Sequence, residues 1–416
     1  MANASAAYPS FLNILNLNLR LLALLLVISI YALWGEPTPD NFGLSELLVG
    51  AGLIYVVGFK GLVGAFRFDA MPGWQKAGAL FLGYGLSCVL INGLMHGNSL
   101  SLIIRDVVPF LFLFLPVFLA GFLRQLDERE RLLLIVFVAL SGVCFATRVI
   151  APVLTDGNLP AFASYVRDPA LLANAPTVLF AAVFLLGASG AVLVQGLTVR
   201  RALCAIGMIV LALAPLAAMA AIQQRASVGY LVIAMFFLMA AGICKHPYRM
   251  GIPMLMAAAA VVIMAPIWTD IVQTLTHKNA LVGFNMRGRE ASAVMDVIDD
   301  SLWSALLGKG WGTTVVSPAV GGAVVNFTHS LVTSTWLKAG LVGVFLMSTY
   351  MGLLGFRLLC VVRHNPVLAA AIAGPFLIDI FLYASYKSLD FGLLLLLIPL
   401  WVDRAVLLKK SYGCSK

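Results

Sequence analysis

Residues 202–220, ALCAIGMIVLALAPLAAMA, contain no charged side chain. A bilayer core of about 30 Å is crossed by roughly 20 helical residues, so this run predicts a transmembrane helix. Hydropathy indicates eleven more such runs before and after it. The twelve expected spans are 20–34, 43–64, 78–95, 107–122, 132–154, 171–195, 202–220, 227–244, 250–268, 329–356, 366–386 and 389–407. We therefore predict an all-α, polytopic integral membrane protein with about 12 transmembrane helices.

The composition agrees with this fold class. Hydrophobic residues make up 62% of the 416 positions and charged residues 11%, with a mean hydropathy of +1.00. Since a soluble domain is about half apolar and about a quarter charged, a soluble, disordered or fibrous protein is excluded. The apolar residues form unbroken runs without alternation, which argues against a membrane β-barrel. We expect a single transmembrane domain over residues 1–416, containing one large periplasmic loop at residues 269–328.

The net charge of +9 has a topological explanation. Most Lys and Arg residues fall in short loops that share one side if the N-terminus is cytoplasmic, as the positive-inside rule requires. We therefore expect both termini in the cytoplasm and a bacterial inner membrane, and no nucleic-acid partner. The six cysteines lie mostly within apolar runs and have no metal-ligand spacing, so we interpret them as packing residues.

The large loop contains one amphipathic pattern. Val294, Ile298 and Leu302 recur at intervals of four residues, which predicts a short helix over about 291–306. Asp296, Asp299 and Asp300 are the only candidates for a divalent-cation site, and they lie on this helix. No Asp-x-Asp motif occurs, so we expect no metal site and no cofactor. A glycine-rich turn follows at residues 308–312, GKGWG.

Three polar positions at the expected outer ends of spans are candidates for function. Arg225 begins the eighth span, where the helix dipole disfavours a cation unless an anion is bound nearby; the alternative is an arginine that contacts lipid headgroups. Arg287 and Arg289 suit capture of phosphate oxygens, or form a solvated pair beside Glu290. His329 opens the tenth span, where the dipole favours a neutral ring that can act as a general base; the alternative is a capping residue.

Three segments together resemble the bacterial O-antigen ligase and O-antigen polymerase superfamily, most closely the ligase. In that family a His opens a transmembrane helix and a Gly-Leu-x-Gly motif follows, as in His329-Ser330 and Gly340-Leu341-Val342-Gly343. Upstream, the family has an Arg, a short helix and a Gly-x-Gly turn, similar to Arg289-Glu290 and residues 306–312. Arg225 resembles a third family feature, an arginine on the outer side that comes earlier in the chain. The motif residues span only about 222–343.

This chain departs from the family pattern at three positions. Ser330 replaces the usual Asn after the histidine, Lys338 stands where an acidic residue is common, and Gln224 replaces a small residue before Arg225. These departures leave the roles of the neighbouring motif residues open. Arg105-Asp106 opens the fourth span and Asp379 lies inside the eleventh, and we interpret these residues as structural.

The resemblance implies a glycosyltransferase of lipopolysaccharide biosynthesis. Its donor would be a glycan on undecaprenyl diphosphate, and its acceptor a hydroxyl of lipid A–core on the periplasmic side. It implies a metal-independent, inverting reaction in which His329 is the base, while Arg225 and either Arg289 or Arg287 bind the diphosphate.

Other activities remain open. The alternatives within the superfamily are a surface polysaccharide polymerase, which would use a second lipid-linked glycan as acceptor, and a protein-glycosylating ligase. The single large outer loop favours the lipopolysaccharide ligase. An alternative outside the superfamily is a transporter or lipid flippase, a class that places charges near the bilayer midplane.

Overall fold

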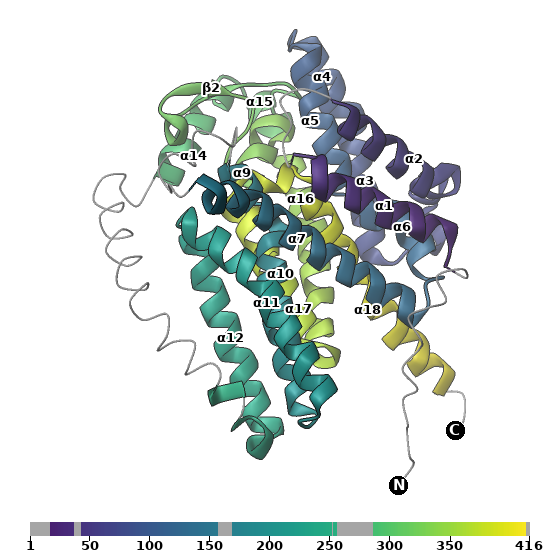
Figure 1. The fold of residues 1–416 in the computed structure, drawn as a ribbon. Helices are drawn as coiled ribbons and strands as arrows, with labels where there is room; N and C mark the ends of the chain where they lie inside the picture. Colours follow the sequence, from purple (N-terminus) through teal and green to yellow (C-terminus); the bar gives the residue numbers. More distant parts are fainter. Residues whose placement is uncertain (1–16, 37–42, 157–168, 252, 256–285, 413–416) are drawn as a thin grey trace.

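The computed structural model describes residues 17–36, 43–156, 169–251, 253–255 and 286–412. Most of these residues form apolar helices packed into one bundle (Figure 1). The helices of the bundle are α1 (Leu19–Trp34), α2 (Leu44–Gly64), α3 (Gly73–Tyr84), α4 (Leu90–Met95), α5 (Leu100–Phe112), α6 (Leu115–Leu123), α7 (Glu128–Asp156), α10 (Pro176–Val194), α11 (Val199–Ala221), α12 (Arg225–Lys245), α16 (Leu331–His364), α17 (Pro366–Phe381) and α18 (Leu389–Tyr412).

Shorter elements connect them. They are the single-turn helices η2 (Phe68–Ala70), η4 (Pro247–Arg249), η5 (Pro318–Val320) and η6 (Ala384–Lys387), the π-helical turn η3 (Gly85–Val89), the helices α9 (Pro169–Ala173), α14 (Met286–Ile298) and α15 (Leu302–Leu307), and the strands β1 (Val315–Ser317) and β2 (Ala323–Val325). The two strands are antiparallel, with Val315 opposite Val325.

Eight helical stretches of the described chain are long and apolar enough to cross a membrane, which makes this an all-α, multi-pass membrane protein. They are Leu44–Gly64, Gly73–Met95, Leu100–Leu123, Glu128–Ala151, Pro176–Val194, Val199–Ala221, Arg225–Lys245 and Leu331–His364. Three further expected spans correspond to the shorter apolar helices α1, α17 and the first part of α18. Residues 256–268 of the expected ninth span lie outside the described residues, so the count of twelve stays a prediction.

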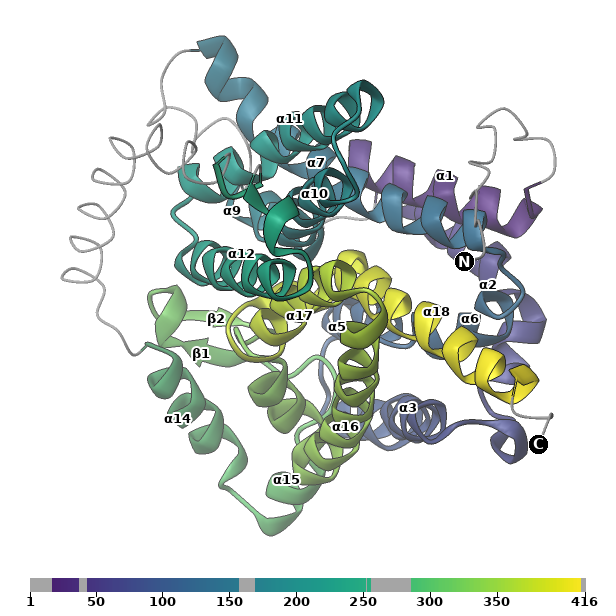
Figure 2. The same cartoon turned by 90° about the horizontal axis from the view of Figure 1, so that it is seen from below.

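The core of the bundle includes buried side chains of α10 and of the first part of α18, two helices that Figure 2 shows from below. Helix α10 packs against α7, α11, α12 and α17. In α18, the side chains from Leu393 to Ile398 are completely or almost completely buried. Burying such apolar side chains among other helices is expected for spans surrounded by protein on all sides. Helix α18 also packs against α16 and η6.

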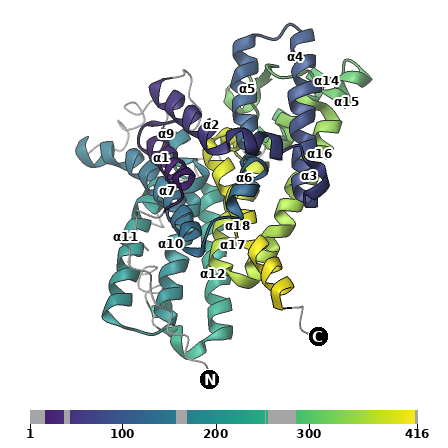
Figure 3. The same ribbon diagram turned by 90° about the vertical axis from the view of Figure 1, so that its right-hand side faces the viewer.

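One segment, α14 to β2, covers one end of the bundle beside α4 and α5 (Figure 3). The sequence predicted a single amphipathic helix over 291–306 here, and this is wrong. Val294 and Ile298 of α14 do pack against Val315 and Leu337, but the helix ends at Ile298 and Leu302 is 74% exposed. A new helix, α15, begins after Ser301, because the Ser301 hydroxyl caps it by accepting a hydrogen bond from the Ser304 backbone N–H.

The glycine-rich turn anchors this segment to the bundle. Gly308, Gly310 and Gly312 all adopt left-handed backbone angles, with φ of 75°, 81° and 83°. A Cβ atom on Gly310 would lie 2.0 Å from the backbone nitrogen of Gly93, so only glycine fits against α4. The following Trp311 donates its indole N–H to the Gly85 carbonyl at 2.7 Å. This carbonyl lies in the π-helical turn η3, where regular helical bonding is interrupted.

Candidate active site

Two hydrogen bonds join His329 to Glu290. The Glu290 carboxylate accepts from the His329 backbone N–H at 3.0 Å, and its Oε1 lies 2.9 Å from the ring Nδ1. His329 lies just before α16, which begins at Leu331 with Ser330 as its N-cap. The sequence predicts that His329 opens this helix, but the helix begins two residues later. The side chain is 22% exposed, so part of the ring is accessible from outside.

Glu290 is held from a second direction by the β-hairpin. The Ser317 hydroxyl of β1 donates to Glu290 Oε1 at 2.8 Å, and the Glu290 side chain is only 2% exposed. Burial by itself raises the pKa of a carboxyl group. Here the hydrogen bonds from His329 and Ser317 outweigh burial and lower the pKa of Glu290 below its ordinary value. Glu290 is therefore a carboxylate at neutral pH.

This carboxylate determines which ring nitrogen of His329 can react. A neutral imidazole has one donor and one acceptor nitrogen. Because Nδ1 faces the Glu290 carboxylate, it carries the proton as the donor. Nε2 is then left as the basic nitrogen, which can take a proton from a substrate hydroxyl. The pair has the arrangement of a base oriented by a carboxylate.

The two candidate arginines of α14 have different surroundings. Arg287 Nη1 lies 3.9 Å from Glu290 Oε2, and its side chain is 39% exposed. Partial burial lowers the pKa of Arg287, and the nearby carboxylate of Glu290 opposes this shift. Arg289 is exposed. Positions two apart on a helix do not face the same way, so only Arg287 lies with Glu290 and His329.

Tyr383, which follows α17, connects Arg287 to the start of α12. Its side chain lies near Arg287 and, on the other side, near Ser227 of α12. Burial raises the pKa of the Tyr383 hydroxyl. Arg225 is the first residue of α12, exposed and within one helical turn of Ser227. The structure therefore brings the beginning of α12 beside the Arg287 side of the site.

The backbone that leads into Arg225 is unusual. Gln223 has a φ of 57°, the only positive value for a non-glycine residue in the described chain. Such a conformation persists only where its surroundings hold it, often at functional sites. Here the neighbouring Gln224 is buried, and its side-chain amide donates to Asn174 Oδ1 at 2.7 Å. The tight turn between α11 and α12 is thus fixed in place.

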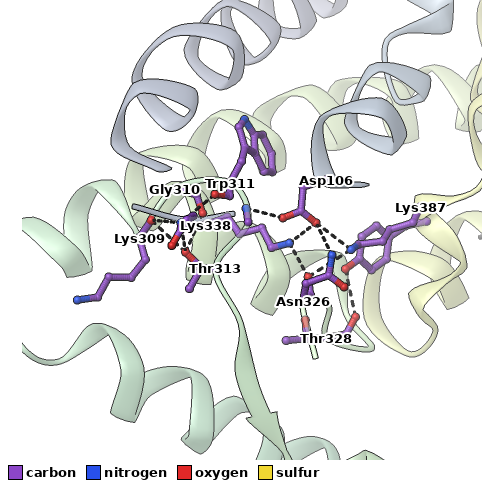
Figure 4. Close-up of polar contacts among 12 residues, drawn as sticks. Asp106, Lys309, Gly310, Trp311, Thr313, Asn326, Thr328, Lys338 and Lys387 are labelled. Carbon is purple, nitrogen blue, oxygen red and sulfur yellow. Dashed lines mark hydrogen bonds and ion pairs between the residues drawn. The ribbon is translucent and has the colours of Figure 1, made fainter. Parts of the chain in front are cut away.

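A buried ion cluster supports the segment before His329 (Figure 4). Asp106 of α5 pairs with Lys338 of α16, and with Lys387 of η6 at 3.0 Å. It also accepts from the backbone N–H of Gly312 at 2.8 Å. Both lysines donate to the carbonyl of Asn326, at 2.5 Å for Lys338 and 3.3 Å for Lys387. The partners of Asp106 lie more than 200 positions away in the sequence, so spacing alone does not predict them.

The structure also adds residues to the site that the sequence alone does not indicate. The sequence indicates Glu290 only as a neighbour of the arginine pair, and it does not indicate Ser317, Tyr383 or Lys387. The one sequence signal for Glu290 is that it follows Arg289 in the segment that resembles the family motif. Among the residues described, no group of three or more His, Cys, Asp or Glu side chains is arranged to hold a metal ion.

Comparison with known proteins leaves the site to be interpreted from its own geometry. No protein-family model matches the chain, and a search of curated proteins finds no match.

Proposed function

We propose that this protein is an inner-membrane glycosyltransferase that moves a glycan from undecaprenyl diphosphate to an acceptor hydroxyl on the periplasmic side. The observation that carries the proposal is the contact of His329 with the buried carboxylate of Glu290, at one end of the bundle and beside Arg287. The motif resemblance supplies the substrate class. Ligation of O-antigen to lipid A–core is the activity that the single large outer loop favours.

The chemistry needs one base and charge stabilisation of the leaving group. The acceptor oxygen attacks the anomeric carbon, its proton passes to His329 Nε2, and the bond from carbon to the diphosphate oxygen breaks. The diphosphate leaves on its lipid with the electron pair of that bond, so the anomeric centre is inverted. General-base catalysis of this kind contributes about 10²–10⁴-fold in rate.

The arginines would act on the leaving group. Diphosphate is a good leaving group that needs its growing negative charge stabilised more than it needs protonation. Arg287 is close to the base, and Arg225 begins the helix that Tyr383 connects to Arg287. We assign these two residues to the diphosphate and Arg289 to the solvent-exposed face of α14.

The test is transfer by purified protein in nanodiscs, with lipid-linked glycan as donor. We expect His329→Ala to lower the rate at least about 10²-fold, and His96→Ala to leave it unchanged, because His96 is an exposed residue whose ring nitrogen lies 2.8 Å from the Asn92 carbonyl of its own helical turn. Transfer at the normal rate by His329→Ala would overturn the proposal. Supplying either lipid A–core or a second lipid-linked glycan as acceptor separates a ligase from a polymerase.

Carboxyl groups inside the bundle favour a second candidate, an ion-coupled transporter. Asp379 of α17 is 1% exposed, and its Oδ2 has no hydrogen-bond partner among the described residues. Asp390 of α18 is buried and accepts from Tyr31 and Thr177. Transport in sealed vesicles that collapses with the proton gradient would support this candidate. Transfer that persists in detergent without any gradient would contradict it.

A further inference from the structure

A buried carboxyl oxygen in α17 has no hydrogen-bond partner among the described residues. It is Oδ2 of Asp379, a residue that is 1% exposed. The other oxygen, Oδ1, accepts a hydrogen bond from the Ser385 hydroxyl at 2.7 Å. Asp390 of α18 shows the contrast, because its Oδ1 and Oδ2 accept from Thr177 and Tyr31. Burying a carboxyl group is costly unless its oxygens are engaged by donors or by a cation, so Oδ2 of Asp379 is available to a ligand.

Asp379 lines a small cavity. The cavity lies between the start of α12, the second half of α17 and the chain that joins α9 to α10. Its free space is about 10 Å³, close to what one water molecule needs. The cavity therefore takes a single small ligand and excludes a sugar or a lipid headgroup.

Oxygen-bearing side chains from these segments line the cavity. They belong to Asn174, Gln224, Ser227, Asp379 and Tyr383. Asn174 Oδ1 accepts from the Gln224 amide at 2.7 Å, which leaves it a second lone pair. Helix α9 ends at Ala173, also in the wall, and carbonyl groups at the end of a helix have no intrahelical partner. Hard cations bind carboxylate, hydroxyl and carbonyl oxygens of this kind.

The charge and the size of the cavity select among the cations. Asp379 is the one carboxylate among the described residues of its wall. In an apolar bundle a buried charge is stable only beside a counter-charge, and a monovalent cation balances a single carboxylate. A calcium ion takes about six or more oxygens, usually from several carboxylates. Sodium without its water shell is smaller than a water molecule, so it fits the space.

We propose that the cavity at Asp379 binds one sodium ion. Asp379 Oδ2 is the charged ligand, and oxygens of Asn174, Ser227 and Tyr383 surround the ion. The ion joins α17 to the start of α12 and to the segment between α9 and α10. This site goes beyond glycosyl transfer, because it needs neither His329 nor a glycan.

The experiment is equilibrium binding of radioactive sodium to the purified full-length protein. The protein is kept in uncharged detergent at mildly alkaline pH, and N-methylglucamine chloride replaces sodium chloride so that the ionic strength stays constant. We expect saturable binding of a single ion. The same titration should raise the unfolding temperature by several degrees, because a ligand that binds only the folded protein stabilises it.

Three variants separate a cation site from a merely structural carboxyl group. Asp379→Asn keeps the acceptor for Ser385 but removes the charge. It should abolish saturable binding, and in sodium-free buffer it should unfold at no lower temperature than the wild type, because it no longer buries a charge without its counter-ion. Ser227→Ala should weaken sodium binding about three- to tenfold through loss of one neutral ligand. Asp296→Asn is the matched control, since Asp296 is exposed on α14, and it should bind sodium as the wild type does.

Each contrary result has a definite meaning. Absence of saturable binding by the wild type, or equal binding by Asp379→Asn, overturns the proposal, and a protonated carboxyl group with one water molecule is then the occupant. Equal displacement of radioactive sodium by potassium also overturns it, because the cavity then does not select sodium. His329→Ala should keep sodium binding while it loses glycosyl transfer, so failure of the cation site and failure of the proposed function are told apart.

Discussion

Glu290 and His329 meet through both the backbone and the side chain of the histidine, at 3.0 and 2.9 Å. The double contact fixes the position of the residue and the orientation of its ring together. Glu290 comes from α14, which precedes the β-hairpin in the sequence, whereas His329 follows it, so the hairpin and both helices must be in place for the pair to form.

The first prediction concerns Glu290 as a positioning residue. Without its carboxylate, the ring loses the group that holds the proton on Nδ1 and leaves Nε2 basic. We expect Glu290→Ala to lower kcat at least about tenfold with little change in donor KM, and Glu290→Gln to lower it as well, because an amide can present its NH₂ group to Nδ1 and so favour the wrong tautomer. Steady-state transfer kinetics measure both. A change in KM alone would show that Glu290 acts on binding instead.

The second prediction is a pH dependence of stability. The folded-state pKa of Glu290 lies below its ordinary value of 4.5. Its contribution to stability is therefore fully present above about 4.5 and is lost as the pH falls through the lowered pKa. We expect the wild-type protein to unfold at a higher temperature than Glu290→Gln at neutral pH, and this difference to shrink in acid. A difference that grows below pH 4.5 would contradict the assignment.

The third prediction separates Arg287 from Arg289. Arg287 lies 3.9 Å from Glu290 and close to Tyr383, whereas Arg289 is exposed. Arg287→Ala should lower kcat/KM about 10²–10³-fold, as expected for loss of a charge that stabilises a leaving group. Arg289→Ala should lower it by less than about fivefold. The reverse order of effects in the transfer assay would place the diphosphate on the other face of α14.

The fourth prediction concerns the glycine-rich turn. A methyl group on Gly310 would meet the backbone of Gly93 at 2.0 Å, and φ is 81° there. Gly310→Ala should therefore destabilise the protein by about 3 kcal/mol or more. Gly321→Ala is the control, because φ is 67° but nothing lies within 4 Å, and it should cost about 1 kcal/mol. Thermal unfolding in detergent measures both, and equal effects would refute the close packing.

The sequence alone determined the fold class and the approximate places of the helices. Eight of the expected spans coincide with long apolar helices, because hydrophobic length and a lack of charge are local properties that the bilayer selects directly. The sequence also indicated His329 and the pair Arg287 and Arg289 as candidates, from residue types at the ends of spans.

Only the tertiary structure decided which of these residues meet. Glu290 and His329 are 39 positions apart, and Asp106 and Lys387 are 281 positions apart. Their contacts depend on the hairpin, on the break between α14 and α15, and on the glycines that let the turn approach α4. These features arise from packing between distant segments, which local hydropathy does not encode. For this reason the spacing of Arg287 and Arg289 left their roles open, while the fold turned one toward Glu290 and the other toward solvent.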